Sequence, residues 1–143
     1  MKAIADSRKR LRASCTGQAA TEFAMIATVL FLLTFGVMML GSAVYSYNTI
    51  SNAAREAVRY AAVHSSSSAA PATDSQIEQV ALDYAQGVNL ALTDVHVTWP
   101  PDPNKGMRSD AQVQISYTYN LKIPFMSAVA LPLSSTSRML VSQ

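Results

Sequence analysis

The sequence predicts an α+β protein: a long N-terminal transmembrane α-helix that extends into a stalk, then a small head with a second helix and a short antiparallel β-sheet. Three observations support this. Of the 143 residues, 50% are hydrophobic and only 14% are charged, whereas soluble domains carry about 25% charged residues. Positions 23–54 contain no charged residue, and a period-two alternation of apolar and polar residues occupies positions 112–123. An apolar run of this length predicts a membrane span, and the alternation predicts a half-buried strand.

The membrane span is expected over residues 23–47, which as a helix would extend about 37 Å. A hydrocarbon core is about 30 Å thick, so the helix can cross it with some tilt. Tyr45 and Tyr47 would then lie in the outer interfacial belt. A secretory signal peptide is the alternative, but its apolar core is about 7–15 residues long. The small residues at 41–43 leave signal-peptidase cleavage open.

The basic residues are concentrated before this span. Only Asp6 opposes them, and the cluster comprises Lys2, Arg8, Lys9, Arg10 and Arg12. Such a cluster keeps its flank in the cytoplasm, so we expect a single-pass protein with the N-terminus cytoplasmic and the head periplasmic or extracellular. Beyond the first dozen residues acidic residues outnumber basic ones, and this argues against a nucleic-acid partner. A surface arm for lipid or nucleic acid is the alternative for the basic segment.

The junction between leader and span reads Gly17-Gln18-Ala19-Ala20-Thr21-Glu22-Phe23. It resembles a type IV prepilin processing site. That resemblance implies that a prepilin peptidase cleaves after Gly17, which leaves Gln18 first, Glu22 fifth and Phe23 sixth in the mature chain. Glycine lets an extended backbone approach a protease closely. Taken singly, Gly17 could be a helix-start residue and Glu22 a carboxylate that reaches the headgroups.

Glu22 is the charged residue at the inner edge of the uncharged span. An ionisable group at this depth is costly and suggests a functional partner. The resemblance to pilins implies that the partner is the new α-amino group of Gln18, in the same subunit or in a neighbour.

The sequence GQAATEFA, the apolar run and the following YNTISNAAREAVRYAAV together resemble the TadE-like pseudopilins. The resemblance covers about residues 15–63, with Ala57 where many relatives have glycine, a difference that would affect helix packing. It implies a minor pseudopilin of a tight-adherence (Flp-type) pilus or type II-like secretion apparatus in the bacterial inner membrane. It also implies the partners: the membrane, the prepilin peptidase, other pilins and pseudopilins, and the assembly platform, with incorporation into the pilus left open.

Helical spacing continues after the span, on a face formed by Tyr47, Ile50, Ala54, Val58 and Ala61. This spacing predicts one helix to about Val63. Arg55, Glu56 and Arg59 lie beside that face, where they form either a solvated helix surface or a contact with another pilin or with lipid phosphates. We therefore divide this part of the chain into a leader over 1–17 and a transmembrane helix with its stalk over 18–63.

The sequence predicts a flexible loop over residues 64–73, because serines and Pro71 interrupt the helical pattern. A second helix then begins at Thr73, which has capping-box spacing to Gln76. Its apolar face is Ile77, Val80, Ala81, Tyr84 and Val88.

The rest of the head, over 74–143, contains the predicted strands. One covers residues 95–99, a turn-rich loop covers 100–106, and the strand with the clearest alternation presents apolar residues from Val113 to Ile123. A last strand is expected over 134–141, after Pro132.

Nothing in the sequence indicates catalysis. It has no nucleophile elbow, glycine-rich phosphate loop, HExxH or CxxC motif. His64 and His96 are far apart without clustered carboxylates, and a single cysteine, Cys15, excludes an internal disulfide. We expect no enzyme activity, cofactor, metal site or small-molecule substrate. The alternative function is an unprocessed, signal-anchored membrane protein whose ectodomain binds a ligand.

Overall fold

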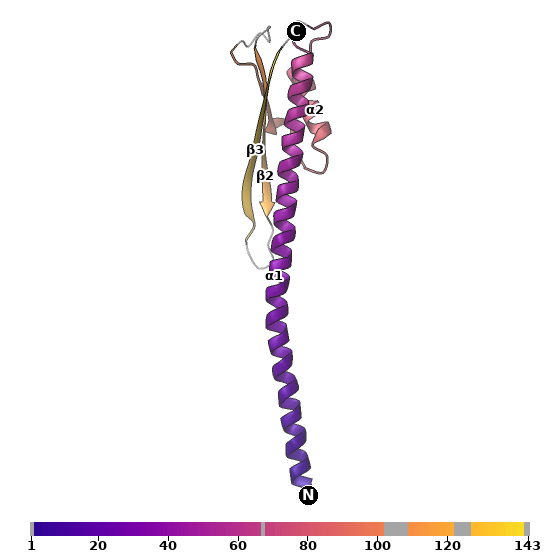
Figure 1. The fold of residues 1–143 in the computed structure, drawn as a ribbon, viewed down its shortest axis with the longest axis vertical. Coiled ribbons are helices and arrows are strands. Elements are labelled where there is room, and N and C mark those ends of the chain that lie inside the picture. The colour runs from indigo at the N-terminus through magenta and orange to yellow at the C-terminus, as the bar shows by residue number, and fades with distance from the viewer. Residues whose placement is uncertain (1, 67, 102–108, 122–126, 142–143) are drawn as a thin grey trace.

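The computed structural model describes residues 2–66, 68–101, 109–121 and 127–141, with the backbone alone for residues 2–16. Helix α1 (Lys2–Val63) has 62 residues and as a regular helix is about 93 Å long. Its N-terminal half projects alone, while its C-terminal half lies between α2 (Asp74–Tyr84) and a β-sheet (Figure 1). The predicted α+β fold with a helical stalk is confirmed.

Burial divides α1 into two halves. In its most apolar stretch no residue is buried, and Phe23, Leu33 and Val37 are exposed. From Ala43 onward, buried residues follow the three- and four-residue spacing of one helical face, and this stripe comprises Ala43, Ser46, Ile50, Ala53, Ala54, Ala57, Val58, Ala61 and Ala62. Most of these side chains are small, so the rest of the head can approach the helix closely. The second half of α1 is thus the central element of the head's core.

The part of α1 that the head covers begins nearer to the N-terminus than the sequence suggested. Ala43 and Ser46 are each only 6% exposed, although both fall within the stretch expected to cross the membrane. The apolar stretch that stays uncovered is residues 23–42, about 30 Å of helix. This length matches a hydrocarbon core of about 30 Å without tilt.

The sheet has the order β1-β2-β3, with both pairs antiparallel. Its strands are β1 (Val95–Thr98), β2 (Asp110–Leu121) and β3 (Val129–Leu140). In β2, Ala111, Val113 and Ile115 are completely buried and alternate with partly exposed polar residues, as the sequence predicts. Ile123 and most of the expected turn at 100–106 lie outside the described residues.

The last strand begins earlier in the chain than the sequence predicted. β3 begins at Val129 and includes Pro132, which pairs with Thr118, whereas the sequence suggested residues 134–141. Proline lacks a backbone N–H, so it ends a central strand but is tolerated in an edge strand. β3 is an edge strand, and this explains why the strand continues through Pro132.

Helix α2 (Asp74–Tyr84) begins as predicted, with Thr73 as its N-cap. The Thr73 N–H donates to Gln76 Oε1 at 2.9 Å, and the Gln76 N–H donates to Thr73 Oγ1 at 3.4 Å. Ile77 and Ala81 are buried in the shared core. In the connection before α2, the Ala72 N–H donates to the His64 carbonyl at 2.9 Å; the flexibility of this loop stays a prediction.

Candidate functional site

The predicted processing junction lies on the exposed, N-terminal half of α1. The helix runs continuously through Gly17, and no described atom would lie within 4 Å of a Cβ added there. Packing within the chain therefore does not require glycine at this position, while glycine inside a helix costs about 0.5–1 kcal/mol relative to alanine. Gly36 and Gly41 are equally open. Gly17 is therefore distinguished as a candidate cleavage position only by the residues next to it in the sequence.

The residues after Gly17 form a local polar network. Gln18 Nε2 donates to Glu22 Oε1 at 3.2 Å, and Thr21 Oγ1 donates to the Gln18 carbonyl at 2.7 Å. Helical side chains tilt toward the N-terminus, so the Glu22 carboxylate points back to the level of Gln18. Phe23, one residue further on, is 73% exposed.

The structure brings the side chains of Gln18 and Glu22 together, whereas the resemblance to pilins implies a contact between Glu22 and the α-amino group of Gln18. In the uncut helix the backbone nitrogen of Gln18 belongs to a peptide bond and carries no charge. The contact between the carboxylate and an α-amino group therefore stays a prediction for the cleaved chain.

Beyond the junction, the two threonines of the apolar stretch form hydrogen bonds within the helix. Thr28 Oγ1 donates to the Ala24 carbonyl and Thr34 Oγ1 to the Leu30 carbonyl, each at 2.8 Å. Such internal hydrogen bonds remove the need for water. This stretch is therefore compatible with a lipid environment.

Arg55, Glu56 and Arg59 lie on the C-terminal half of α1, about 60 Å along the helix from Gly17 at about 1.5 Å per residue. Arg55 is exposed. Arg59 Nη1 lies 3.9 Å from Glu56 Oε2, and the Arg59 side chain is 71% exposed. An exposed pair at this distance contributes little to stability, so these charges remain available for other contacts.

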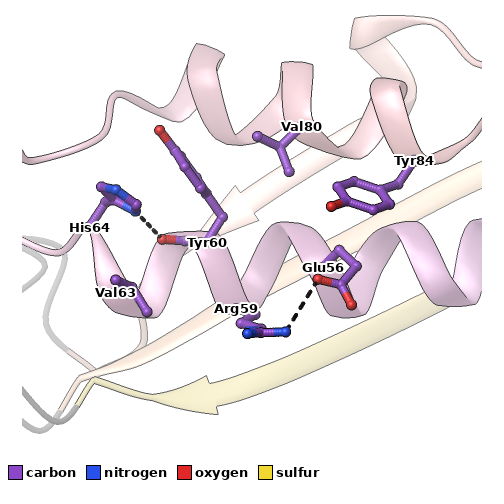
Figure 2. A pocket seen from close by; sticks show the side chains of 7 residues that line it. All are labelled: Glu56, Arg59, Tyr60, Val63, His64, Val80 and Tyr84. Carbon is purple, nitrogen blue, oxygen red and sulfur yellow. Dashed lines mark hydrogen bonds and ion pairs between the residues drawn. The ribbon is translucent and has the colours of Figure 1, made fainter.

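Glu56 and Arg59 also line a groove between α1 and α2 (Figure 2). The groove has a volume of about 220 Å³ and is lined by Glu56, Arg59, Tyr60, Val63, His64, Val80 and Tyr84. Pockets for small molecules usually occupy about 300–1,000 Å³. The groove is therefore small for a metabolite and better suited to one or two side chains of another protein.

One wall of this groove is built from an aromatic pair. The rings of Tyr60 and His64 stack with centroids 4.1 Å apart and an angle of 27° between their planes. His64 Nδ1 donates to the Tyr60 carbonyl at 3.0 Å, which fixes the imidazole in place. The groove could not be predicted from the sequence, because α1 and α2 meet only in the folded head.

The sequence also missed a link between α2 and the end of β1. Trp99 Nε1 donates to Asp74 Oδ1 at 3.3 Å, and Trp99 is 7% exposed. Asp74 is the first residue of α2. Its position in the first turn of α2, where a carboxylate is favoured, was the only available signal.

No group of three or more His, Cys, Asp or Glu within metal-binding reach occurs among the residues that the structure describes. His96 is exposed on β1, as expected, and His64 is half-buried against Tyr60.

The match to a known protein family lies in the first part of the chain. Neither the curated proteins nor the solved structures contain a match. Part of the chain does match a family of pilus-associated structural proteins linked to tight-adherence pilus systems. Its model covers the processing junction, the exposed span and the charged residues of the stalk, and it ends before α2 and the sheet. Residues 17–59 match the family model described as TadE-like protein, which confirms the family resemblance of the N-terminal sequence.

Proposed function

We propose that this protein is a minor pseudopilin that a prepilin peptidase cleaves after Gly17 and that acts in assembly of a tight-adherence (Flp-type) pilus or a type II-like secretion apparatus. The leader is residues 1–17, the transmembrane helix and stalk are 18–63, the connecting loop is 64–73, and the head is 74–143. The head faces the periplasm or the exterior, and the leader stays in the cytoplasm.

The observation that carries this proposal is the division of α1. Its C-terminal half is buried by the head from Ala43 onward, whereas its apolar N-terminal half is not buried by any of the residues that the structure describes. An uncovered apolar helix needs either lipid or other helices around it. In a membrane it is surrounded by lipid, and in a pilus it would pack against the helices of other subunits.

Cleavage after Gly17 would change the chemistry at Glu22. Gln18 would then carry a positive α-amino group at the N-terminus of the helix, where the helix dipole also favours negative charge. The Glu22 carboxylate already contacts the Gln18 side chain at 3.2 Å. It is thus close enough to pair with the new amino group of its own chain or of a neighbour at the same level.

Apolar packing alone would give assembly little specificity, because replacing lipid by another helix changes the surroundings of α1 only slightly. Glu22 would supply specificity at the inner end of the helix. Arg55, Glu56 and Arg59 would supply it on the stalk, where the groove between α1 and α2 can accept side chains of another subunit.

The experiment uses cells that make the pilus and two substitutions with different expected results. Gly17→Val should block cleavage, because a branched side chain hinders approach of the protease, and full-length protein should accumulate in the membrane. Glu22→Gln should still be cleaved but should reduce piliation, because the amide cannot pair as a charge with the α-amino group.

Each substitution has a matched control. Gly36→Val changes an equally open glycine and should leave cleavage normal, and Glu78→Gln changes a carboxylate on α2 and should leave piliation normal. Normal cleavage of Gly17→Val, or normal piliation of cells with either Gly17→Val or Glu22→Gln, would contradict the proposal. An uncleaved wild-type chain would favour the signal-anchored binding protein.

A further inference from the structure

An apolar patch lies at the end of the β2–β3 hairpin. It consists of Tyr119 and Leu121 on β2 and of Val129 and Leu131 on β3, and we call it the hairpin-end patch. Leu121 pairs with Val129, and Tyr119 pairs with Leu131, so the four side chains are on one face of the sheet. Val129 is 48% exposed and Leu131 is 40% exposed.

This face is the same one that forms the core at the other end of the sheet. Val113 and Ile115 precede Tyr119 at even spacing on β2, and both are completely buried. Tyr117, Tyr119 and Leu121 are each partly exposed. The head therefore covers the apolar face at one end of the sheet and leaves it open at the other.

The open end of the sheet lies beside α1. It is next to the end of the exposed apolar stretch that is nearer to the head. It points toward the N-terminal half of the helix, whereas the covered end lies near the C-terminal end of α1 (Figure 1). From Gly17 onward, where the structure describes side chains, Ala43 is the first buried residue of α1. Met39, one turn earlier on the same face, is partly covered, while Met38 and Leu40 on either side of it are exposed.

The length of the span fixes the level of the patch relative to a bilayer. Residues 23–42 extend about 30 Å as a helix, which matches the thickness of a hydrocarbon core. If Phe23 lies at the inner boundary of that core, the outer boundary falls near residue 42. The hairpin-end patch then lies at the outer headgroup layer.

We propose that the hairpin-end patch rests in the outer interfacial layer of the bilayer that α1 crosses. The patch is apolar, contains no charged residue and includes a tyrosine, a residue enriched at membrane interfaces. Tyr47, on the adjacent turn of α1, is 47% exposed and provides a second tyrosine near this level. Contact with lipid covers the exposed apolar face of the hairpin-end patch. It also keeps the strands aligned with α1.

This inference rests on the membrane span of the proposed function but not on cleavage by a peptidase. The test therefore uses the full, uncleaved chain in vesicles of phosphatidylcholine and phosphatidylglycerol. In a Cys15→Ser background, an environment-sensitive fluorophore is attached to one of three single-cysteine variants: Val129→Cys in the patch, Leu140→Cys at the far end of β3, or Val29→Cys in the span.

Leu140 is the control for Val129. It is 58% exposed, lies on the same strand about 37 Å away along it and is on the opposite face of the sheet. With nitroxide-labelled lipids, the fluorophore at position 129 should be quenched several-fold more than the fluorophore at position 140, and its emission should lie at shorter wavelength. If the Val129 label disturbs the circular dichroism spectrum, Leu131→Cys replaces it.

Equal quenching at positions 129 and 140 would overturn the proposal. So would a blue-shifted label at 129 that lipid does not quench, because another protein chain would then cover the patch. The label at position 29 separates the two proposals. If it is quenched and the label at 129 is not, only the lipid contact fails. If neither is quenched, the membrane span itself is wrong.

Discussion

The side chain of Tyr45 on α1 lies against Gly87 in the loop after α2. A Cβ on Gly87 would lie 3.2 Å from Tyr45 Oη and 3.6 Å from Tyr45 Cε1, and the φ angle of Gly87 is +88°. Glycine is required here both by the left-handed backbone and by the nearby ring. The contact also places Tyr45 within the folded head, above the part of α1 that remains free for the membrane.

Gly87→Ala should therefore destabilise the head by about 1–2 kcal/mol, the usual cost of a side chain in this backbone region. Thermal unfolding in detergent, followed by Trp99 fluorescence, measures the effect. The control is Gly41→Ala, which is on the open side of α1 with no atom within 4 Å. Equal melting temperatures for wild type and Gly87→Ala would show that the loop does not pack as described.

Ala57→Leu should destabilise the head, because Ala57 on α1 is completely buried. Overpacking a well-packed core costs about 1–3 kcal/mol. Asn52→Leu adds a similar side chain at an exposed position of the same helix and should change stability by less than about 0.5 kcal/mol. If both variants unfolded at the wild-type temperature, the C-terminal half of α1 would not be the core of the head.

Thr73→Ala should weaken the start of α2, because it removes the acceptor for the Gln76 N–H. Loss of such a cap costs about 0.5–2 kcal/mol. Ser75→Ala, two residues later and also exposed, is the control. Urea denaturation in detergent would reveal the difference, and the account of the cap is wrong if the two variants have the same midpoint.

Asp74→Ala should leave the Trp99 indole N–H, which is nearly buried, without its acceptor on α2. The cost of an unsatisfied buried donor is about 1–3 kcal/mol. Asp83→Ala removes an exposed carboxylate from the last turn of the same helix, where negative charge is unfavourable, and should have little effect. The same denaturation assay distinguishes them, and a smaller effect at Asp74 than at Asp83 would contradict the role of this hydrogen bond.

Local patterns predicted much of the fold. The capping box of Thr73 and Gln76 and the alternation along β2 depend on residues close together in the chain, and both are present in the structure. The start of β3 was not predictable in this way. Pro132 is acceptable only because β3 is an edge strand, and strand order is a long-range property.

The candidate site also has one part that could be predicted from the sequence and another part that could not. The Gly17–Phe23 junction is a continuous sequence, so it could be identified before the fold was known. The burial of Ala43 by the head and the groove beside Arg59 depend on contacts between segments distant in sequence. The periodicity of α1 indicated an apolar face but not which part of it faces the head and which part faces the membrane.

The most direct test of the central claim is the intact mass of the protein purified from the membranes and pili of bacteria that carry it. Cleavage after Gly17, followed by use of the exposed half of α1 in assembly, predicts a chain that begins at Gln18 and is present in both fractions or in the membrane at the base of the pilus. A chain that still begins at Met1 in every fraction would contradict the account.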